Sequence, residues 1–93
     1  MAYRLKFKDE ALKEWYRLDS TLREQFKKKL AEHMQDPRVP AAKLAGQADR
    51  YKIKLKSSGY RLVYEVRDAE VVIVVVAIGK RERNAVYATA AKR

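Results

Sequence analysis

Residues 51–67 read YKIKLKSSGYRLVYEVR, and this pattern predicts a β-hairpin. Apolar residues alternate with lysines through 51–56, which is the two-residue period of a strand with one buried face. The small residues 57–59 supply the turn, and residues 60–67 return as a second strand. The outer face of the first strand is therefore made entirely of lysine.

Two further strands complete the predicted sheet. Residues 71–78 read VVIVVVAI, which is typical of a central strand covered on both faces, and Gly79 is expected to end it. The turn at 68–70 connects this strand to the hairpin. Residues 3–7 alternate apolar and basic side chains, which predicts the first strand of the chain.

The segment after the first strand has the pattern of a helix. Asp9 is expected to cap it, and the helix should run to about Leu18. Its apolar residues recur at helical spacing, which predicts one buried face. That face contains Ala11, Leu12, Trp15 and Leu18.

A second helix is expected to begin at Thr21, because Thr21 and Glu24 have the spacing of a capping box. It should end near Asp36, since Pro37 lacks an amide donor and disfavours helical geometry in the residue before it. Its predicted buried stripe is Leu22, Phe26, Leu30 and Met34. A short final helix is predicted from Asn84 onward.

The order of these elements predicts the fold class. A strand, two helices, a three-stranded meander and a short helix favour an α+β domain with a mainly antiparallel sheet of about four strands. The two N-terminal helices should pack on one side of that sheet. With 93 residues and no linker-like stretch, we expect a single domain over residues 1–93.

The composition favours a polyanionic partner. The chain has 22 Lys and Arg against 12 Asp and Glu, a formal net charge of +10, while 47% of its residues are hydrophobic. A folded domain with this charge is expected to bind nucleic acid, because each phosphate that it neutralises releases counterions. We expect a cytoplasmic protein without a membrane partner, because the N-terminus lacks a signal-peptide core and the apolar run 71–78 is too short to span a bilayer.

Basic residues from three segments are expected to converge at one end of the sheet. The hairpin turn brings Arg61 back beside the strand lysines, and the strand 71–78 delivers the basic run 79–83. For the lysines alone, a solvated edge strand that resists sheet-to-sheet aggregation is the simpler interpretation. With the other segments, the surface suits single-stranded RNA.

Three tyrosines are candidates to stack on RNA bases near this surface. They are Tyr60, Tyr64 and Tyr87. Tyr60 and Tyr64 share a strand with Leu62 and Val66, so a core or half-core position is favoured for both.

The missing residue types limit the chemistry. There is no Cys, and His33 is the sole histidine, which excludes a two-histidine ribonuclease; its mid-helix position indicates a surface residue rather than a catalytic one. The acidic residues lack the spacing of a carboxylate metal site. Glu65 either points toward the basic cluster or pairs with a neighbouring base. A Lys crowded by like charges can lose its proton near neutral pH and act as a base on a ribose 2′-hydroxyl, while cations stabilise the transition state.

Six motifs lie along almost the whole chain: MAY at 1–3, ALKEW at 11–15, YKIKL at 51–55, SSGYRLVY at 57–64, GKRER at 79–83 and VY at 86–87. Together they resemble the RelE family of bacterial toxins. The family belongs to a wider group that also contains ParE-like gyrase inhibitors without nuclease activity.

The resemblance implies a ribosome-dependent endonuclease that needs no cofactor or metal. Such a toxin cuts mRNA within the codon in the ribosomal A site and leaves a cyclic phosphate and a 5′-hydroxyl. At the positions matching the family's functional residues, Lys54 is the preferred base and Lys52 a stabilising cation. Arg61 would stabilise the phosphate, Arg81 would assist the leaving oxygen electrostatically, and Tyr87 would stack on or orient the nucleotide.

The same resemblance implies partners and further contacts. We expect an acidic RelB-like antitoxin that folds on the basic surface, and contact with DNA solely through that antitoxin. Additional RNA-binding residues are predicted at Lys43, Lys56, Lys80 and Arg83. A ParE-like gyrase inhibitor and a basic RNA-binding module without nuclease activity remain the alternatives.

Overall fold

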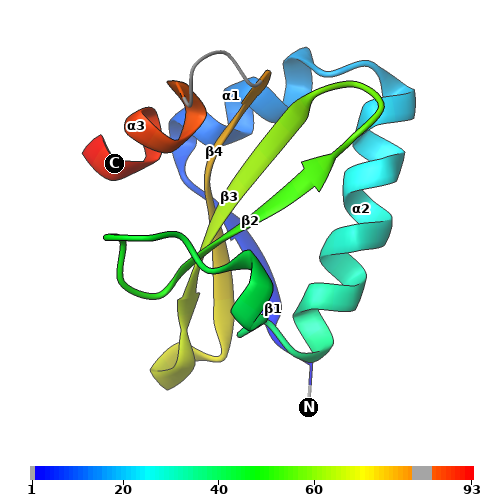
Figure 1. The fold of residues 1–93 in the computed structure, drawn as a ribbon. Coiled ribbons are helices and arrows are strands. Elements are labelled where there is room, and N and C mark those ends of the chain that lie inside the picture. Colours follow the sequence, from blue (N-terminus) through cyan, green and yellow to red (C-terminus); the bar gives the residue numbers. More distant parts are fainter. Residues whose placement is uncertain (1, 81–84) are drawn as a thin grey trace.

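The centre of the fold is a four-stranded sheet with helices around it (Figure 1), as a computed structural model shows for residues 2–80 and 85–93. The predicted α+β class is confirmed. The strands and helices are β1 (Arg4–Phe7), α1 (Asp9–Arg17), α2 (Ser20–Gln35), β2 (Arg50–Leu55), β3 (Tyr60–Arg67), β4 (Val72–Lys80) and α3 (Ala85–Lys92). Within the described residues, no helix is both long enough and apolar enough to cross a membrane.

The strand order is β1-β4-β3-β2, so β4 is central and β2 lies at an edge, as predicted. Neighbours β2, β3 and β4 pair antiparallel, whereas β1 pairs parallel with β4, with Arg4 opposite Val72. The sheet is thus mixed, and its antiparallel pairs are in the majority. The parallel pair is possible because both helices and the hairpin separate the two strands in sequence, which gives the long crossover that parallel strands need.

The end of β4 differs from the prediction. Gly79 does not end the strand, which continues to Lys80. A Cβ atom at Gly79 would lie 2.7 Å from Cγ2 of Val86, so the glycine admits a close approach of α3. At the other end, Val71 has φ 54° and precedes the strand.

Both predicted helix starts are shifted. Asp9 is the first residue of α1 rather than its cap, and Lys8 occupies the N-cap position. The negative charge of Asp9 in the first turn still stabilises the helix, because it lies at the positive end of the helix dipole. For α2 the cap is Asp19, whose side chain accepts a hydrogen bond of 2.9 Å from the amide of Leu22. The predicted start at Thr21 was therefore wrong, because an aspartate two residues earlier caps the helix.

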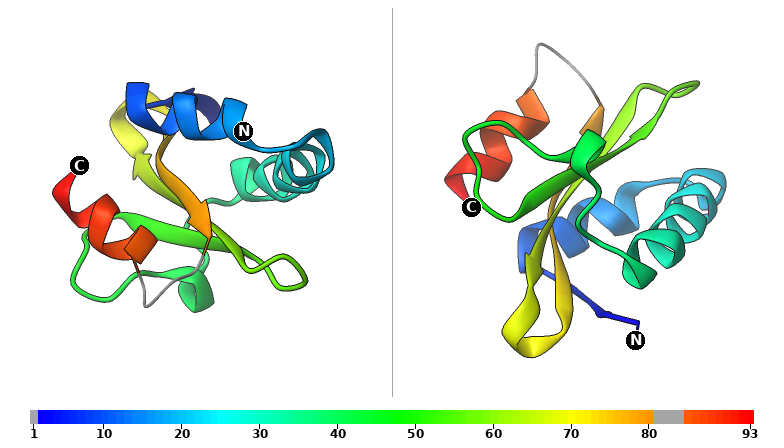
Figure 2. Two further views of the ribbon diagram at one scale, coloured as in Figure 1. Left: turned by 90° about the horizontal axis from the view of Figure 1, so that it is seen from above. Right: turned by 60° about the horizontal axis from the view of Figure 1, so that its bottom comes forward.

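Helices cover both faces of the sheet (Figure 2): α1 and α2 pack on one face, as predicted for the two N-terminal helices, and α3 packs on the other. The face under α1 and α2 holds the larger core, with the aromatic residues Trp15, Phe26 and Tyr64 buried in it. Leu12, predicted to be buried, is 36% exposed, because the buried face of α1 is centred on Ala11 and Trp15.

The opposite face lies under α3 and has a core of smaller residues. Its members are Leu44, Val63, Val76, Ala77, Val86 and Ala90. A register shift between β3 and β4 supplies two of them, because Val63 lies opposite Ala77 while the next residue, Tyr64, lies opposite Val75. The extra residue, Val76, interrupts the alternation of β4, as a β-bulge does. Consecutive residues Val76 and Ala77 thereby reach the same core.

Candidate active site

The β2–β3 hairpin brings the predicted basic residues together. Lys54 lies directly opposite Arg61, and Lys52 lies opposite Val63, two positions along the strand. Arg61 in turn pairs with Gly79 of β4. The turn is closed by a hydrogen bond of 2.9 Å from the amide of Gly59 to the carbonyl of Leu55, and Gly59 adopts the positive φ of 76° that favours glycine.

Helix α3 places the predicted tyrosine beside this hairpin. The ammonium of Lys52 lies 5.9 Å from the centre of the Tyr87 ring, within the range of a cation–π interaction. The carbonyl of Tyr87 accepts a hydrogen bond of 3.2 Å from Nε2 of Gln47, in the loop before β2. The ring is half-buried against the smaller core, so one part of it is held while another faces solvent.

Arg61 is the buried cation of the site. Its side chain is 8% exposed, and its Nη1 donates to the carbonyl of Tyr60 at 3.1 Å. Among the described residues, its Nε atom is buried and has no hydrogen-bond partner. A buried donor without a partner is costly, and the positive charge of this guanidinium can stabilise a nearby phosphate through electrostatics.

Polar contacts hold α3 against the sheet. Arg50 of β2 donates to the carbonyl of Ala90 and forms an ion pair of 3.2 Å with Glu65. Arg93 forms an ion pair of 2.8 Å with Glu14 of α1 and donates to the carbonyl of Val76 at 2.9 Å. The helix that carries Tyr87 is therefore tied to three other elements by cations.

Glu65 pairs with neighbouring basic side chains, which was one of the two predicted possibilities. It accepts from Nε of Arg50 at 3.2 Å and from Nε of Arg67 at 2.8 Å. Burial tends to raise the pKa of Glu65, but the hydrogen bonds from Arg67 and Arg50 outweigh it, and the pKa lies below its ordinary value. Glu65 is consequently a structural carboxylate that steadies Arg50.

Of the predicted RNA contacts, Lys56 and Lys80 are exposed at the end of the sheet where the site lies. Lys43 is occupied by the protein itself, since its ammonium donates to the carbonyl of Gln47 at 2.7 Å and lies 5.9 Å from the ring centre of Tyr51. The predicted residues Arg81 and Arg83 lie outside the described residues.

The preference for core positions of the two strand tyrosines is confirmed. Tyr64 is fully buried, and Tyr60 is partly buried against the larger core. The hydroxyl of Tyr64 donates to the carbonyl of Pro37 at 2.6 Å, and burial raises its pKa. Tyr87 lies beside the predicted catalytic residue Lys52.

His33 lies closer to the predicted catalytic lysines, and is more buried, than its mid-helix position predicted. It is half-buried rather than on the surface, its Nδ1 lies 2.6 Å from the Tyr64 hydroxyl, and burial lowers its pKa. It also lines the same hollow as Lys52 and Lys54. The sequence signal was its spacing, because His33 follows Leu30 by three residues and so shares the buried stripe of α2.

Potential metal ligands do not gather in the parts of the chain that the structure describes. Residues 2–80 and 85–93 contain no group of three or more histidine, aspartate or glutamate side chains placed to hold a metal ion. The carboxylates near the sheet are instead paired with arginines, as in the ion pair of Asp68 with Arg38 at 2.7 Å. The described cluster offers cationic and hydroxyl groups, which suit a phosphate better than a cation.

Comparisons with known proteins agree with this geometry. The model of the family described as ParE toxin of type II toxin–antitoxin system, parDE, matches residues 5–85. The mRNA interferase toxin RelE of Escherichia coli strain K12 is 60% identical over 93 residues, which cover 100% of this chain and 98% of the relative. A putative RelE-like toxin protein of Escherichia coli is 53% identical over the same shares of both chains.

Solved structures give the same result. A doubly substituted variant of E. coli toxin RelE in the free state superposes with a TM-score of 0.92 at 58% identity, over 100% of this chain and 98% of that one. The same variant in complex with an antitoxin RelBc peptide has a TM-score of 0.85 at 58% identity, with the same shares covered. The chain therefore belongs to the RelE family of type II toxins, within the wider group that the ParE toxin model describes.

Proposed function

We propose that this chain is a ribosome-dependent endoribonuclease that cuts mRNA in the ribosomal A site and inhibits translation. The observation that carries the proposal is the pairing of Lys54 with Arg61 across the hairpin, beside Lys52 and the ring of Tyr87. Relatives that share 60% of their residues with this chain over its full length are named mRNA interferases. Because its substrate is translating mRNA, we place the protein in the cytoplasm.

The proposed reaction is an internal transfer at phosphorus. The amine of Lys54 takes the proton of the ribose 2′-hydroxyl, the 2′ oxygen bonds to phosphorus, and the bond to the 5′ oxygen breaks. The leaving 5′ oxygen takes a proton from solvent, with Arg81 contributing positive charge. Lys52 and the buried guanidinium of Arg61 stabilise the added negative charge in the transition state. Tyr87 orients the nucleotide by stacking.

An antitoxin is the second partner in this proposal. E. coli toxin RelE has been solved with an antitoxin RelBc peptide and as the intact RelBE complex. We propose that an acidic RelB-like protein covers the basic surface of this chain, and that contact with DNA occurs through that protein. The excess of 22 basic over 12 acidic residues supports an acidic partner.

Primer-extension mapping of a defined mRNA on programmed ribosomes tests the activity. The unaltered chain should produce a cut inside the A-site codon, and Lys54→Ala and Arg81→Ala should both weaken it. Lys27→Ala is the matched control, because Lys27 lies on α2 in an ion pair of 3.3 Å with Glu24 and should leave the cut unchanged. A folded chain that gives no cut would overturn the proposal.

One observation favours a second candidate, since the matching family model is named for ParE toxins. A ParE-like chain would inhibit gyrase without cutting RNA. The discriminating measurement is supercoiling of plasmid DNA by gyrase in the presence of the chain. Reduced supercoiling together with an uncut mRNA would establish this alternative.

A further inference from the structure

Two adjoining hollows run along the edge of the sheet between α2 and β2. The first encloses about 540 Å³, and Lys29, His33, Lys52, Lys54 and Lys56 are among the residues that line it. The second encloses about 360 Å³ between α2 and the hairpin turn, and it shares Lys29 and Lys56 with the first. We call the two hollows together the α2–β2 groove, defined by Lys29, His33, Lys52, Lys54 and Lys56. One end of it is thus formed by the lysines of the proposed active site.

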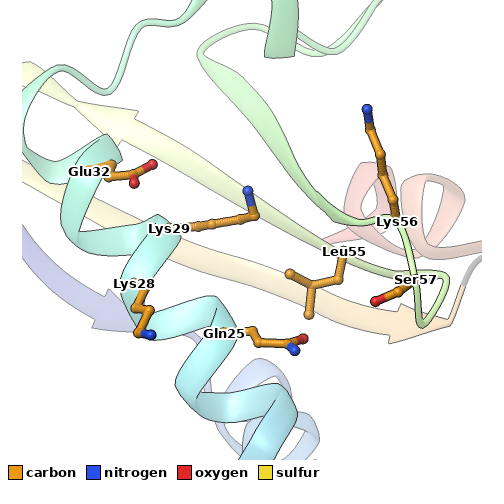
Figure 3. Close-up of a pocket in the computed structure, with 7 residues that line it drawn as sticks. All are labelled: Gln25, Lys28, Lys29, Glu32, Leu55, Lys56 and Ser57. Atoms are coloured by element: carbon orange, nitrogen blue, oxygen red, sulfur yellow. The ribbon is translucent and has the colours of Figure 1, made fainter.

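The far end of the groove is drawn in Figure 3. Lys29 and Gln25 reach from α2 toward Leu55 of β2, whereas the side chain of Lys28 stays turned along the helix. Ser57 lies across from them in the hairpin turn. Leu55 gives this end an apolar floor, and its rim carries lysines together with Gln25, Glu32 and Ser57. The lysines supply the positive charge that tracks a sugar–phosphate backbone.

The charge of the groove is strongly positive. Across both hollows, five lysines line the walls against one carboxylate, that of Glu32. Lysines 52 and 54 stand about 7 Å apart along the strand, so cations recur at intervals instead of meeting at one point. A row of separated cations fits an extended polyanion better than a single small anion.

We infer that the α2–β2 groove holds the RNA strand that continues from the cut, with its phosphates passing from Lys52 and Lys54 to Lys29 and Lys56. The inference rests on the proposed function, because the catalytic lysines fix where the strand enters. The occupant is a single strand, since a ladder of lysines beside an apolar floor tracks a flexible backbone without reading its sequence.

His33 gives the middle of the groove a fixed polar edge. The Tyr64 hydroxyl has one proton and donates it to the carbonyl of Pro37, because a carbonyl oxygen can only accept a hydrogen bond. The contact of 2.6 Å between His33 and that hydroxyl therefore requires a proton on Nδ1 of the histidine. Nε2 is then the ring nitrogen not used by Tyr64, on a ring whose orientation the buried Tyr64 sets.

The test measures binding of single-stranded RNA with 2′-O-methyl groups, which cannot be cut by 2′-oxygen attack. A trinucleotide and a decanucleotide of the same composition are titrated at several salt concentrations. Lys29→Gln should weaken binding of the decanucleotide and reduce its log–log salt slope by about 0.7, the value for one phosphate contact on a single strand. Binding of the trinucleotide, which reaches the active-site lysines alone, should be unchanged.

Two further variants test whether the effect is specific to the groove. Lys27→Gln removes the same charge from the same helix at a residue paired with Glu24, and it should leave the decanucleotide slope unchanged. Glu32→Gln removes the carboxylate of the groove and should strengthen binding of the decanucleotide. Equal slopes for Lys29→Gln and Lys27→Gln, or no binding of the decanucleotide by the unaltered chain, would overturn the inference.

This test separates the groove from the activity. If the slope falls as expected while ribosomes yield no cut, the proposed function fails and the groove remains an RNA site. If ribosomal mRNA is cut but the two lysine variants behave alike, the activity stands and the groove is rejected. A loss confined to ribosome binding would instead assign Lys29 to ribosomal RNA and would also reject the substrate track.

Discussion

The two faces of the sheet are built differently. Under α1 and α2 the core contains large aromatic residues, including Phe26 and Tyr64, both fully buried. Under α3 the core consists of valine, alanine and one leucine, and cations such as Arg50 and Arg93 hold the helix in place. The first face therefore supplies most of the stability, while the thinner second face leaves space for the basic groups of the site.

The largest expected effect is on the aromatic face. Phe26→Ala should lower the free energy of unfolding by about 3–5 kcal/mol, because it removes a fully buried ring and leaves a cavity. Val86→Ala on the α3 face should lower the free energy of unfolding by about 1.6 kcal/mol, since it removes the equivalent of two buried methylene groups at about 0.8 kcal/mol each. Urea denaturation of both variants measures the difference, and equal losses would contradict the division between the faces.

An intermediate effect is expected where α3 approaches the sheet most closely. Gly79→Ala should destabilise the fold by about 1–3 kcal/mol, because the new methyl group would lie 2.7 Å from Cγ2 of Val86. Thermal unfolding monitored by circular dichroism measures this loss.

The double variant with Val86→Ala tests the cause. Removing that methyl group relieves the contact, so the double variant should lose less stability than the sum of the two single changes. Additive losses would show that Gly79 is needed for another reason.

Alternation and spacing predicted most of the fold. The lysine alternation located β2 and its edge position, and the hairpin turn correctly placed Arg61 beside the lysines. The uniform apolar run of β4 carried no signal for the extra residue Val76, because an interruption is visible only where polar and apolar residues alternate. The same run predicted a strand covered on both faces but carried no signal that α3 supplies the second cover.

The site was predicted in part. Hairpin geometry related Lys54 to Arg61. The sequence made Tyr87 a stacking candidate near the basic surface, but its place beside Lys52 comes from the structure. The burial of Arg61 and the place of His33 depend on contacts between elements distant in sequence. Local patterns contain no information on such contacts.

The smallest expected effect concerns the polar ties of α3. Glu65→Gln should lower the free energy of unfolding at neutral pH by about 1 kcal/mol, because the carboxylate that steadies Arg50 loses its charge. The pKa of Glu65 is lowered in the folded chain, so the folded state favours the ionised form. Its contribution is complete above the ordinary glutamate pKa of about 4.3 and is lost as the pH falls through the lower folded value.

Urea unfolding at a series of pH values from neutral to acid measures this dependence. The gap in stability between the unaltered chain and Glu65→Gln should shrink as the pH falls, whereas Glu24→Gln, at a carboxylate 65% exposed, should produce little gap at any pH. A gap that stays constant into acid would mean that Arg50 holds α3 through the carbonyl of Ala90 without help from the charge of Glu65. The hold of Arg50 on α3 would then depend on the backbone carbonyl of Ala90, and the contrast with the aromatic face would lie in packing rather than in the charge of Glu65.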